Sequence, residues 1–191
     1  IVLGNELLDA MPVECFRVGA DGIEQLQVGW EENRFAWRGM RANDALRDRV
    51  TALGLPESYV SETGFAAEGW VRSIADILEQ GVLLLVDYGF PGHEFYHPQR
   101  TTGTLMCHYR HRAHDDPLML VGLQDITAHV DFTAVAKAGA ESGLSLLGYN
   151  SQALFLLGCG LDDLAARTSQ SDARAYLQFT NEVKKLTLPH E

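Results

Sequence analysis

The sequence is short of long hydrophobic stretches and of cysteine. No apolar run approaches the roughly eighteen residues that a membrane-spanning helix needs, and no basic segment precedes an apolar one at the start. The three cysteines, Cys15, Cys107 and Cys159, form no Cys-x-x-Cys pair and cannot all pair within one chain, which suits a reducing compartment. These absences disfavour a membrane-spanning or disulfide-rich secreted protein, and we expect a soluble intracellular one.

Basic residues are outnumbered by acidic ones. The chain has 15 Lys and Arg against 26 Asp and Glu, which gives a net charge of −11. Such a protein repels the phosphates of nucleic acids and anionic lipids, and it attracts cationic partners. We therefore expect neither nucleic acid nor a membrane surface among its partners.

Several catalytic and nucleotide-binding motifs are missing as well. The sequence has no Gly-x-Ser-x-Gly element, and Cys107, the cysteine nearest to histidines, falls in a predicted strand rather than at a helix N-terminus. Covalent catalysis by serine or cysteine is therefore disfavoured. Neither the phosphate-binding loop nor Gly-x-Gly-x-x-Gly occurs, so the glycine-rich half of a nucleotide-binding fold is not visible.

Two apolar segments predict buried parallel strands. Val82–Val86 is a continuous aliphatic run followed by polar residues and Gly89, and Ile1–Gly4 is a similar run with no initiator methionine before it. Unbroken aliphatic strands are typical of a parallel sheet covered by helices, in which ligands bind beyond the carboxyl ends of the strands. We expect an α/β protein, and we interpret the apolar start as a strand whose preceding elements lie upstream.

Between these two strands the sequence predicts an antiparallel hairpin. Glu14–Val18 and Ile23–Trp30 are partly alternating segments that flank the turn signal Gly19-Ala20-Asp21-Gly22. Asn33–Met40 is suited to extend the same sheet. The β-rich region therefore covers approximately residues 14–40.

Helical periodicity and capping residues predict the remaining elements. Asn43 and Asp131 are suitable N-caps, and Gly54 and Gly143 are placed to end helices. Gln152–Leu157 is apolar and fits either a helix or a strand. The expected helices are Asn43–Leu53, one within Ser61–Gln80, Phe132–Glu141, Leu161–Arg167 and Asp172–Leu177, and the expected further strands are Thr101–Tyr109 and Leu144–Leu147.

Polar side chains follow both predicted parallel strands. Asn5, Glu6 and Asp9 come directly after the first, and Asp87 and Tyr88 come after the second. An amide and carboxylates at the shared edge of a sheet can hold a cationic nitrogen and accept its proton. Helix capping and ordinary surface positions are the alternative interpretation of the same residues.

A histidine group raises an alternative, a metal site. His108, His111 and His114 precede Asp115 and Asp116, and imidazole and carboxylate are ordinary ligands of zinc and iron. Histidines three residues apart share a face only on a helix, whereas this segment is predicted as a strand and a turn. The favoured interpretation is a surface loop with no metal.

A series of motifs spans nearly the whole chain. They are Asn5–Pro12, Val86–Gly89, Arg100, Gly103–Leu105, His111–Asp115, Gly122, Asp125–Phe132, Gln152, Phe155–Leu156, Gly160 and Asn181–Leu186. In order and spacing, these motifs resemble the MidA-like family of S-adenosylmethionine-dependent methyltransferases, whose mitochondrial members methylate an arginine of a respiratory complex I subunit during assembly.

This resemblance implies a class I methyltransferase fold, which is a Rossmann-like sheet with helices on both faces and insertions. Ile1–Gly4 resembles the fourth strand of that sheet and Val82–Val86 the fifth. The first three strands, with the glycine-rich cofactor loop, would lie upstream. We therefore expect residues 1–191 to be a single-domain fragment without the N-terminal cofactor-binding half, inactive alone, with residues 14–40 as a β-hairpin insertion.

The resemblance also implies a function and a set of site residues. The expected activity is arginine N-methylation of a protein substrate with S-adenosylmethionine, linked to complex I assembly or a bacterial counterpart, in the cytoplasm of a bacterium or the mitochondrial matrix of a eukaryote. Carboxylates are needed to orient a guanidinium group. The expected catalytic residues are Glu6, Asp9 and Asn5, the last also beside the cofactor, and the expected substrate-binding residues are Pro12, Asp87, Tyr88, Asp125 and Thr127.

Two other functions remain open at this point. The region Glu14–Met40, with Trp30, Phe35 and Trp37, would suit a non-catalytic module that docks a partner protein during assembly. The histidine group would suit a metal-dependent hydrolase. The sequence predicts no particular oligomeric state.

Overall fold

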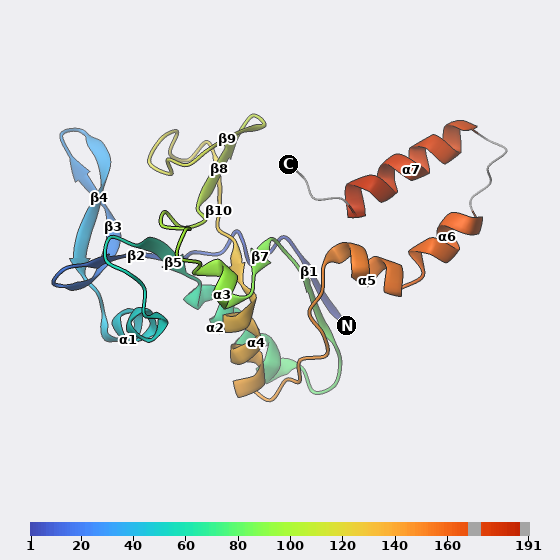
Figure 1. Ribbon diagram of the computed structural model, residues 1–191, viewed down its shortest axis with the longest axis horizontal. Helices are drawn as coiled ribbons and strands as arrows, with labels where there is room; N and C mark the ends of the chain where they lie inside the picture. The colour runs from blue at the N-terminus through green and yellow to red at the C-terminus, as the bar shows by residue number, and fades with distance from the viewer. Residues whose placement is uncertain (168–172, 188–191) are drawn as a thin grey trace. The chain divides into compact units, whose positions relative to one another are not determined.

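A computed structural model describes residues 1–167 and 173–187 (Figure 1). The chain divides into two compact units, Ile1–Ser145 and the residues from Leu146 onward. Each unit is described by itself below. No helix within the described ranges is both long and apolar enough to cross a membrane.

The first unit contains the predicted parallel strands. β1 (Val2–Asn5) pairs in parallel with β6 (Leu83–Val86), with Asn5 opposite Val86. A second parallel pair follows, β7 (Gly89–Phe90) with β11 (Val130–Asp131). Gly89 is required there because a Cβ atom would lie 2.2 Å from the carbonyl oxygen of Val130. The two strands predicted from unbroken aliphatic runs are thus confirmed.

An antiparallel sheet with the order β4-β3-β2-β5 lies between β1 and β6 in the chain. Its strands are β2 (Glu14–Gly19), β3 (Gly22–Glu31), β4 (Arg34–Arg41) and β5 (Val60–Thr63). The β3–β4 turn has positive φ angles at Glu32 and Asn33, +47° and +63°, the arrangement that suits a two-residue hairpin loop. The predicted hairpin and its extension are present.

Two helices lie on either side of β5 in the chain, and the first of them contacts β3 of this sheet. α1 (Asp44–Leu53) begins at Asn43, whose side chain accepts the N–H of Leu46, and ends at Gly54 in the left-handed region. α2 is Phe65–Ile77. The helix predicted within Ser61–Gln80 is therefore confirmed, and the first residues of that range, Ser61–Thr63, belong instead to β5, which pairs with β2.

The core of this unit joins α1, β2 and the short helix α3 (Gly92–Phe95). An ion pair links the two longer helices: Arg49 of α1 donates to both carboxylate oxygens of Glu68 on α2, at 2.7 and 3.0 Å. Only 4% of the Glu68 side chain is exposed, so this carboxylate depends on its arginine partners. The buried core residues are Phe16, Ala42, Leu46, Val50, Tyr59, Phe95 and Tyr96.

A second antiparallel sheet carries two of the predicted site residues, Asp125 and Thr127. β8 (Met106–Tyr109) lies between β10 (Asp125–Thr127) and β9 (Arg112–His114), all antiparallel. The strand predicted over Thr101–Tyr109 is therefore shorter than expected.

α4 (Phe132–Glu141) begins at Asp131, whose side chain accepts two amide protons, as predicted for a cap. Leu144–Leu147, predicted as a strand, has no regular structure and lies in no strand pair of the described chain. The amide of Leu144 instead donates to Gly139 at the end of α4, and Leu146 and Leu147 are exposed.

The second unit is helical in its described residues. It contains α5 (Gln152–Gly158), α6 (Leu161–Arg167) and α7 (Ala173–Thr187). The side chain of Gln152 donates to the carbonyl of Leu186 at 2.9 Å and so joins α5 to α7. The ambiguous segment Gln152–Leu157 is thus a helix. Of the predicted helix Asp172–Leu177, its first residue lies outside the described residues and the rest lies in α7.

Candidate active site

The tight turn after β1 is organised by Asp87 from the end of β6. One oxygen of Asp87 accepts the amide protons of Leu7, Leu8 and Asp9 at 3.0, 2.8 and 3.4 Å. Glu6 at the start of this turn has a φ of +48°, an uncommon conformation for a residue with a side chain. Because Asp87 holds three consecutive amides, it fixes the segment that carries Glu6 and Asp9.

Tyr88 lies against the same turn. Its hydroxyl donates to Glu6 at 3.3 Å, which orients a carboxylate that is otherwise exposed. Partial burial, and then the negative charge of Glu6, raise the pKa of Tyr88. Tyr88 therefore stays protonated and serves as a hydrogen-bond donor to Glu6.

Asp9 is the buried carboxylate of the site. It is 7% exposed, and its Oδ1 atom has no hydrogen-bond partner. Burial raises its pKa first of all, followed by the negative charges of Asp87, Glu6 and Asp125. A hydrogen bond from the backbone of Ala10 acts in the opposite direction and lowers the pKa. A buried carboxylate oxygen without a partner is costly, so a donor group would stabilise Asp9.

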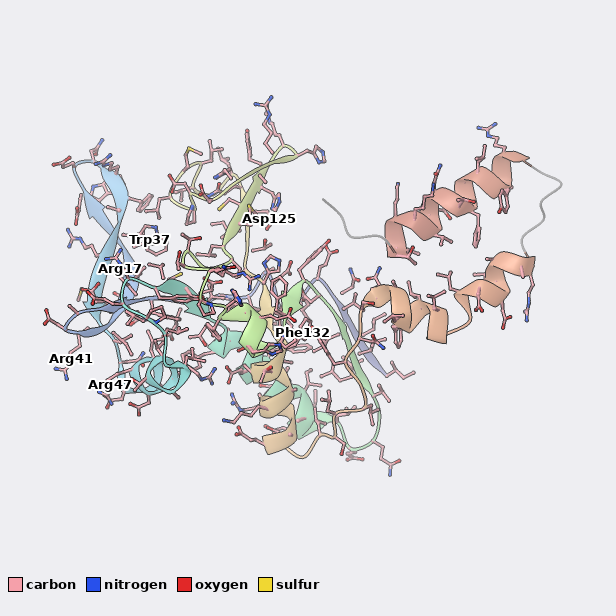
Figure 2. The ribbon with its side chains drawn as sticks, viewed as in Figure 1. Arg17, Trp37, Arg41, Arg47, Asp125 and Phe132 are labelled. Atoms are coloured by element: carbon pink, nitrogen blue, oxygen red, sulfur yellow. The ribbon has the colours of Figure 1, made fainter. Side chains whose placement is uncertain are left out.

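An open pocket of about 310 Å³ leads to Asp9. Its walls come from the segment after the β1 turn, from the β2 and β4 strands, and from the β10 region. Figure 2 marks Trp37 on β4 and Asp125 on β10. The lining residues are Asp9, Ala10, Met11, Pro12, Val13, Cys15, Trp37, Leu105, Ile126, Thr127 and Ala128.

The structure thus brings most of the predicted site residues together. Asn5, Glu6, Asp9, Asp87 and Tyr88 lie at the adjoining ends of β1 and β6. Pro12 and Thr127 line the same pocket as Asp9. Asp125 is exposed and does not line the pocket, although its charge acts on Asp9.

The carboxylates around the pocket are not neutralised by basic side chains. Within residues 1–167 and 173–187, none of Glu6, Asp9, Asp87 and Asp125 has a Lys, Arg or His nitrogen within 4.0 Å. Asp9 alone of the four lines the pocket, and negative charge that no basic side chain offsets favours a cationic ligand there.

Eight lining residues were not predicted as part of the site: Ala10, Met11, Val13, Cys15, Trp37, Leu105, Ile126 and Ala128. Most of them lie close in the sequence to a predicted site residue, whereas Trp37 and Leu105 come from parts of the chain remote from Asp9, and only the fold places these two at the pocket. Burial raises the pKa of Cys15 to about 12, so its thiol stays protonated and acts as an apolar wall. The sequence predicted a role for Trp37 only as part of a surface that docks a partner protein, and not as a residue of the pocket.

A buried polar network supports the β10 wall. Glu62 of β5 is 1% exposed and accepts both the amide and the hydroxyl of Thr104, at 2.8 and 2.5 Å. The hydroxyl of Thr104 accepts the amide of His129 at 2.9 Å. Gly103 is needed beside this network, because its φ is +76° and a Cβ atom would lie 2.2 Å from Glu62.

The histidine group does not form a metal site in the described residues. His108 pairs with Ala113 and His114 with Cys107, so the two histidines lie on opposite faces of the β8–β9 pair. His111 lies in the turn between the strands, at a φ of +63°. No three His, Cys, Asp or Glu side chains of the described chain are arranged to hold an ion.

Comparison with known proteins identifies related chains. The protein arginine methyltransferase NDUFAF7, mitochondrial, of Danio rerio is 27% identical over 198 residues, which cover 100% of this chain and 44% of that protein. The mitochondrial homolog of Caenorhabditis elegans is 28% identical over 186 residues, 89% of this chain and 39% of its own length. The chain therefore spans less than half the length of these curated relatives.

A solved structure is more similar. A Burkholderia thailandensis protein described as a "likely methyl transferase", crystallised with S-adenosyl-homocysteine, is 46% identical with a TM-score of 0.92. The match covers 97% of this chain and 48% of that one, and it confirms the α/β fold.

A family model described as "Putative S-adenosyl-L-methionine-dependent methyltransferase" matches residues 1–150. This match covers most of the chain and agrees with the resemblance of its motifs to the MidA-like proteins. The chain therefore belongs to this S-adenosylmethionine-dependent methyltransferase family.

Proposed function

We propose that this chain supplies the acceptor side of an S-adenosylmethionine-dependent protein arginine N-methyltransferase. The observation that carries the proposal is Asp9, a buried carboxylate with an unpartnered oxygen that lines an open pocket and has three further carboxylates near it. The names of the curated relatives support a protein arginine substrate.

A guanidinium group fits this arrangement. It carries a delocalised positive charge and five N–H donors, and carboxylates are its usual partners. In the proposal, Glu6 and Asp9 hold the guanidinium, Asp87 keeps their turn in place, and Tyr88 keeps Glu6 oriented. Pro12 and Thr127 form part of the pocket wall, and Asp125 contributes negative charge at a greater distance.

Methylation of a guanidinium nitrogen releases one proton, which a side chain must accept. Asp9 is suited to this role because its raised pKa makes it a stronger base than an ordinary aspartate. Glu6 is exposed and hydrogen-bonded to Tyr88, so it is better suited to orienting the substrate.

The residues present fit the methyl-donating end of the cofactor. When bound, S-adenosylmethionine supplies a methyl group on a positively charged sulfur for transfer to nitrogen. The unpaired carboxylates would favour that positive charge, and Asn5, at the carboxyl end of β1, would lie beside the methyl group. Groups for the adenine and ribose would come from elsewhere in a longer polypeptide.

Two observations support an upstream cofactor-binding half. Within the described chain β1 pairs only with β6, and Leu3 is 66% exposed, although parallel strands are normally covered on both faces. The chain also matches only 48% of the Burkholderia thailandensis protein. We therefore propose a class I sheet with helices on both faces, of which residues 1–191 form a single-domain fragment that is inactive alone and residues 14–40 are an insertion.

The proposed cellular role follows the relatives. Action in complex I assembly, or on a bacterial counterpart, would place the protein in the mitochondrial matrix or the bacterial cytoplasm, and the curated relatives are named as mitochondrial. The alternative, a non-catalytic assembly module, is favoured only by the exposed aromatic side chains of the β3–β4 hairpin, which include Trp30 and Phe35.

Calorimetric titration of S-adenosylhomocysteine separates these two functions. We expect the longer polypeptide to bind it, and we expect Glu6→Gln to bind it equally well but to lose methyl transfer. The 191-residue chain, once circular dichroism shows that it is folded, should bind weakly or not at all. Absence of binding by the longer polypeptide would refute the enzyme function and favour the assembly module.

A further inference from the structure

One face of the β3–β4 hairpin is apolar and exposed. In the antiparallel register Val28 lies opposite Trp37, and Trp30 lies opposite Phe35. Residues two apart on a strand share a face, so all four side chains lie on the same side. We call Val28, Trp30, Phe35 and Trp37 the hairpin face; their exposed fractions are 53%, 57%, 41% and 39%.

The other face of the same hairpin is polar. Arg38 donates to Glu31 across the strands at 2.6 Å, and both side chains are about half exposed. Gln27 also lies on this side. A hairpin that is polar on one side and aromatic on the other has a face suited to a partner, because exposed aromatic patches mark interaction surfaces.

The hairpin face continues into the pocket that leads to Asp9. Trp37 belongs to both, since it is part of the hairpin face and lines the pocket. Cys15, another lining residue, pairs with Leu26, which lies two residues before Val28 on the same side of β3. The apolar side of the hairpin therefore reaches the pocket of Asp9 at Trp37, with the buried Leu26 and Cys15 behind it.

The edge of the sheet beside this face is also free. β4 is the outer strand in the order β4-β3-β2-β5, and within the described chain nothing pairs with its outer edge. A free strand edge offers backbone N–H and C=O groups to an extended segment of another protein.

We propose that the hairpin face is the docking surface for the acceptor protein, and that it selects an extended segment with an arginine and apolar side chains at alternate positions on one side of it. This inference rests on the proposed function. The arginine enters the pocket past Trp37, where its guanidinium can stack on the indole ring on its way to Asp9. The apolar side chains cover Val28, Trp30 and Phe35.

The geometry sets the spacing of these side chains. Neighbouring same-face positions on a strand are about 7 Å apart, and an extended peptide advances by the same distance every two residues. Apolar residues two and four positions from the arginine, on one side of it, would therefore lie over the hairpin face. The negative charge near Asp9 favours a cationic side chain in the pocket, which in the proposed segment is the arginine.

Two synthetic peptides test this inference with the longer polypeptide. Both contain one arginine in a glycine-serine background; one peptide has leucine and phenylalanine two and four residues from the arginine, and the other has serine there. Each peptide is made in two versions, one with these two positions before the arginine and one with them after it. In one of the two orientations, we expect the KM of the apolar peptide to be about tenfold lower than the KM of the serine peptide.

Variants of the hairpin face should remove this preference. Trp30→Ser with Phe35→Ser should raise KM for the apolar peptide to that of the serine peptide, while kcat and S-adenosylhomocysteine affinity stay unchanged. Gln27→Ser, on the polar face of the same strand, is the matched control and should keep the preference. Trp30→Ser alone gives a second variant if the double variant folds poorly.

The outcomes separate this inference from the function on which it rests. Equal KM values for both peptides with the wild-type enzyme would overturn the docking surface and leave methyl transfer intact. Binding of S-adenosylhomocysteine without transfer to either peptide would overturn the extended arginine segment as the occupant. Neither binding nor transfer would overturn the proposed function and this inference with it.

Discussion

Removal of the Asp87 carboxylate should unfold the turn that carries the site. Two of its hydrogen bonds, to the amides of Leu7 and Leu8, are 3.0 and 2.8 Å long, and the third, to the amide of Asp9, is 3.4 Å. At about 1 kcal/mol net for each shorter bond and less for the longest, Asp87→Ala should lower the free energy of unfolding by about 2–3 kcal/mol. Asp87→Asn keeps one acceptor oxygen, so its free energy of unfolding should fall by about half as much as that of Asp87→Ala.

Urea denaturation of the longer polypeptide measures this loss as a shift of the transition midpoint. Asp76→Ala is the matched control, because Asp76 lies exposed near the end of α2, and it should change stability by less than about 0.5 kcal/mol. Methyl transfer should fall in Asp87→Ala because Glu6 and Asp9 lose their fixed positions. If Asp87→Ala proves as stable as Asp76→Ala, the carboxylate does not organise the turn.

Two further predictions concern buried carboxylates. Arg49→Met should lower the free energy of unfolding by about 2 kcal/mol in chemical denaturation, because it removes two hydrogen bonds to the buried Glu68 and leaves this carboxylate with Arg72 alone. Arg72→Met should cost about 0.5 kcal/mol, since Arg72 is 43% exposed and Arg49 stays in place; equal losses would contradict this difference. The raised pKa of Asp9 means that the folded protein binds this proton more tightly than the unfolded chain does. The contribution of the protonated Asp9 to the free energy of unfolding is therefore full below the ordinary pKa of 3.8, and it is lost as the pH rises through the pKa of the folded state. Asp9→Asn should therefore be more stable than wild type at pH 7, and thermal unfolding followed from pH 3 to 7 should show the difference shrinking at low pH; a difference that grows as the pH falls would refute the raised pKa.

Local signals were sufficient to predict much of the fold. Asn43 and Asp131 cap helices as their side chains suggest, because a cap depends only on residues within one turn. The unbroken aliphatic run ending at Val86 is a parallel strand, as its composition indicates. The polar residues that follow it meet those that follow β1, because the ends of parallel neighbours adjoin.

Features that depend on distant pairing were predicted less well. Ser61–Thr63 have no strong strand pattern of their own and become a strand because they pair with β2. Leu144–Leu147 has the composition of a strand but finds no partner strand in the described chain. In each case the tertiary environment overrides the local preference.

The pocket itself was the least predictable part of the site. Asp9 was recognised from its position after β1, but Trp37 and Leu105 reach the pocket from β4 and from the segment before β8. Nothing local in the sequence connects these residues, since their proximity depends on how the separate sheets are arranged. The unpartnered Oδ1 of Asp9 is likewise a property of the folded chain.

The most direct test of the central claim is transfer of a labelled methyl group from S-adenosylmethionine to a peptide with a single arginine, catalysed by the longer polypeptide. The peptide with lysine in place of arginine is the control for substrate chemistry. We predict labelling of the arginine peptide alone, and its loss in Asp9→Asn with S-adenosylhomocysteine affinity retained. Full labelling by Asp9→Asn would contradict the claim that this buried carboxylate serves the acceptor guanidinium.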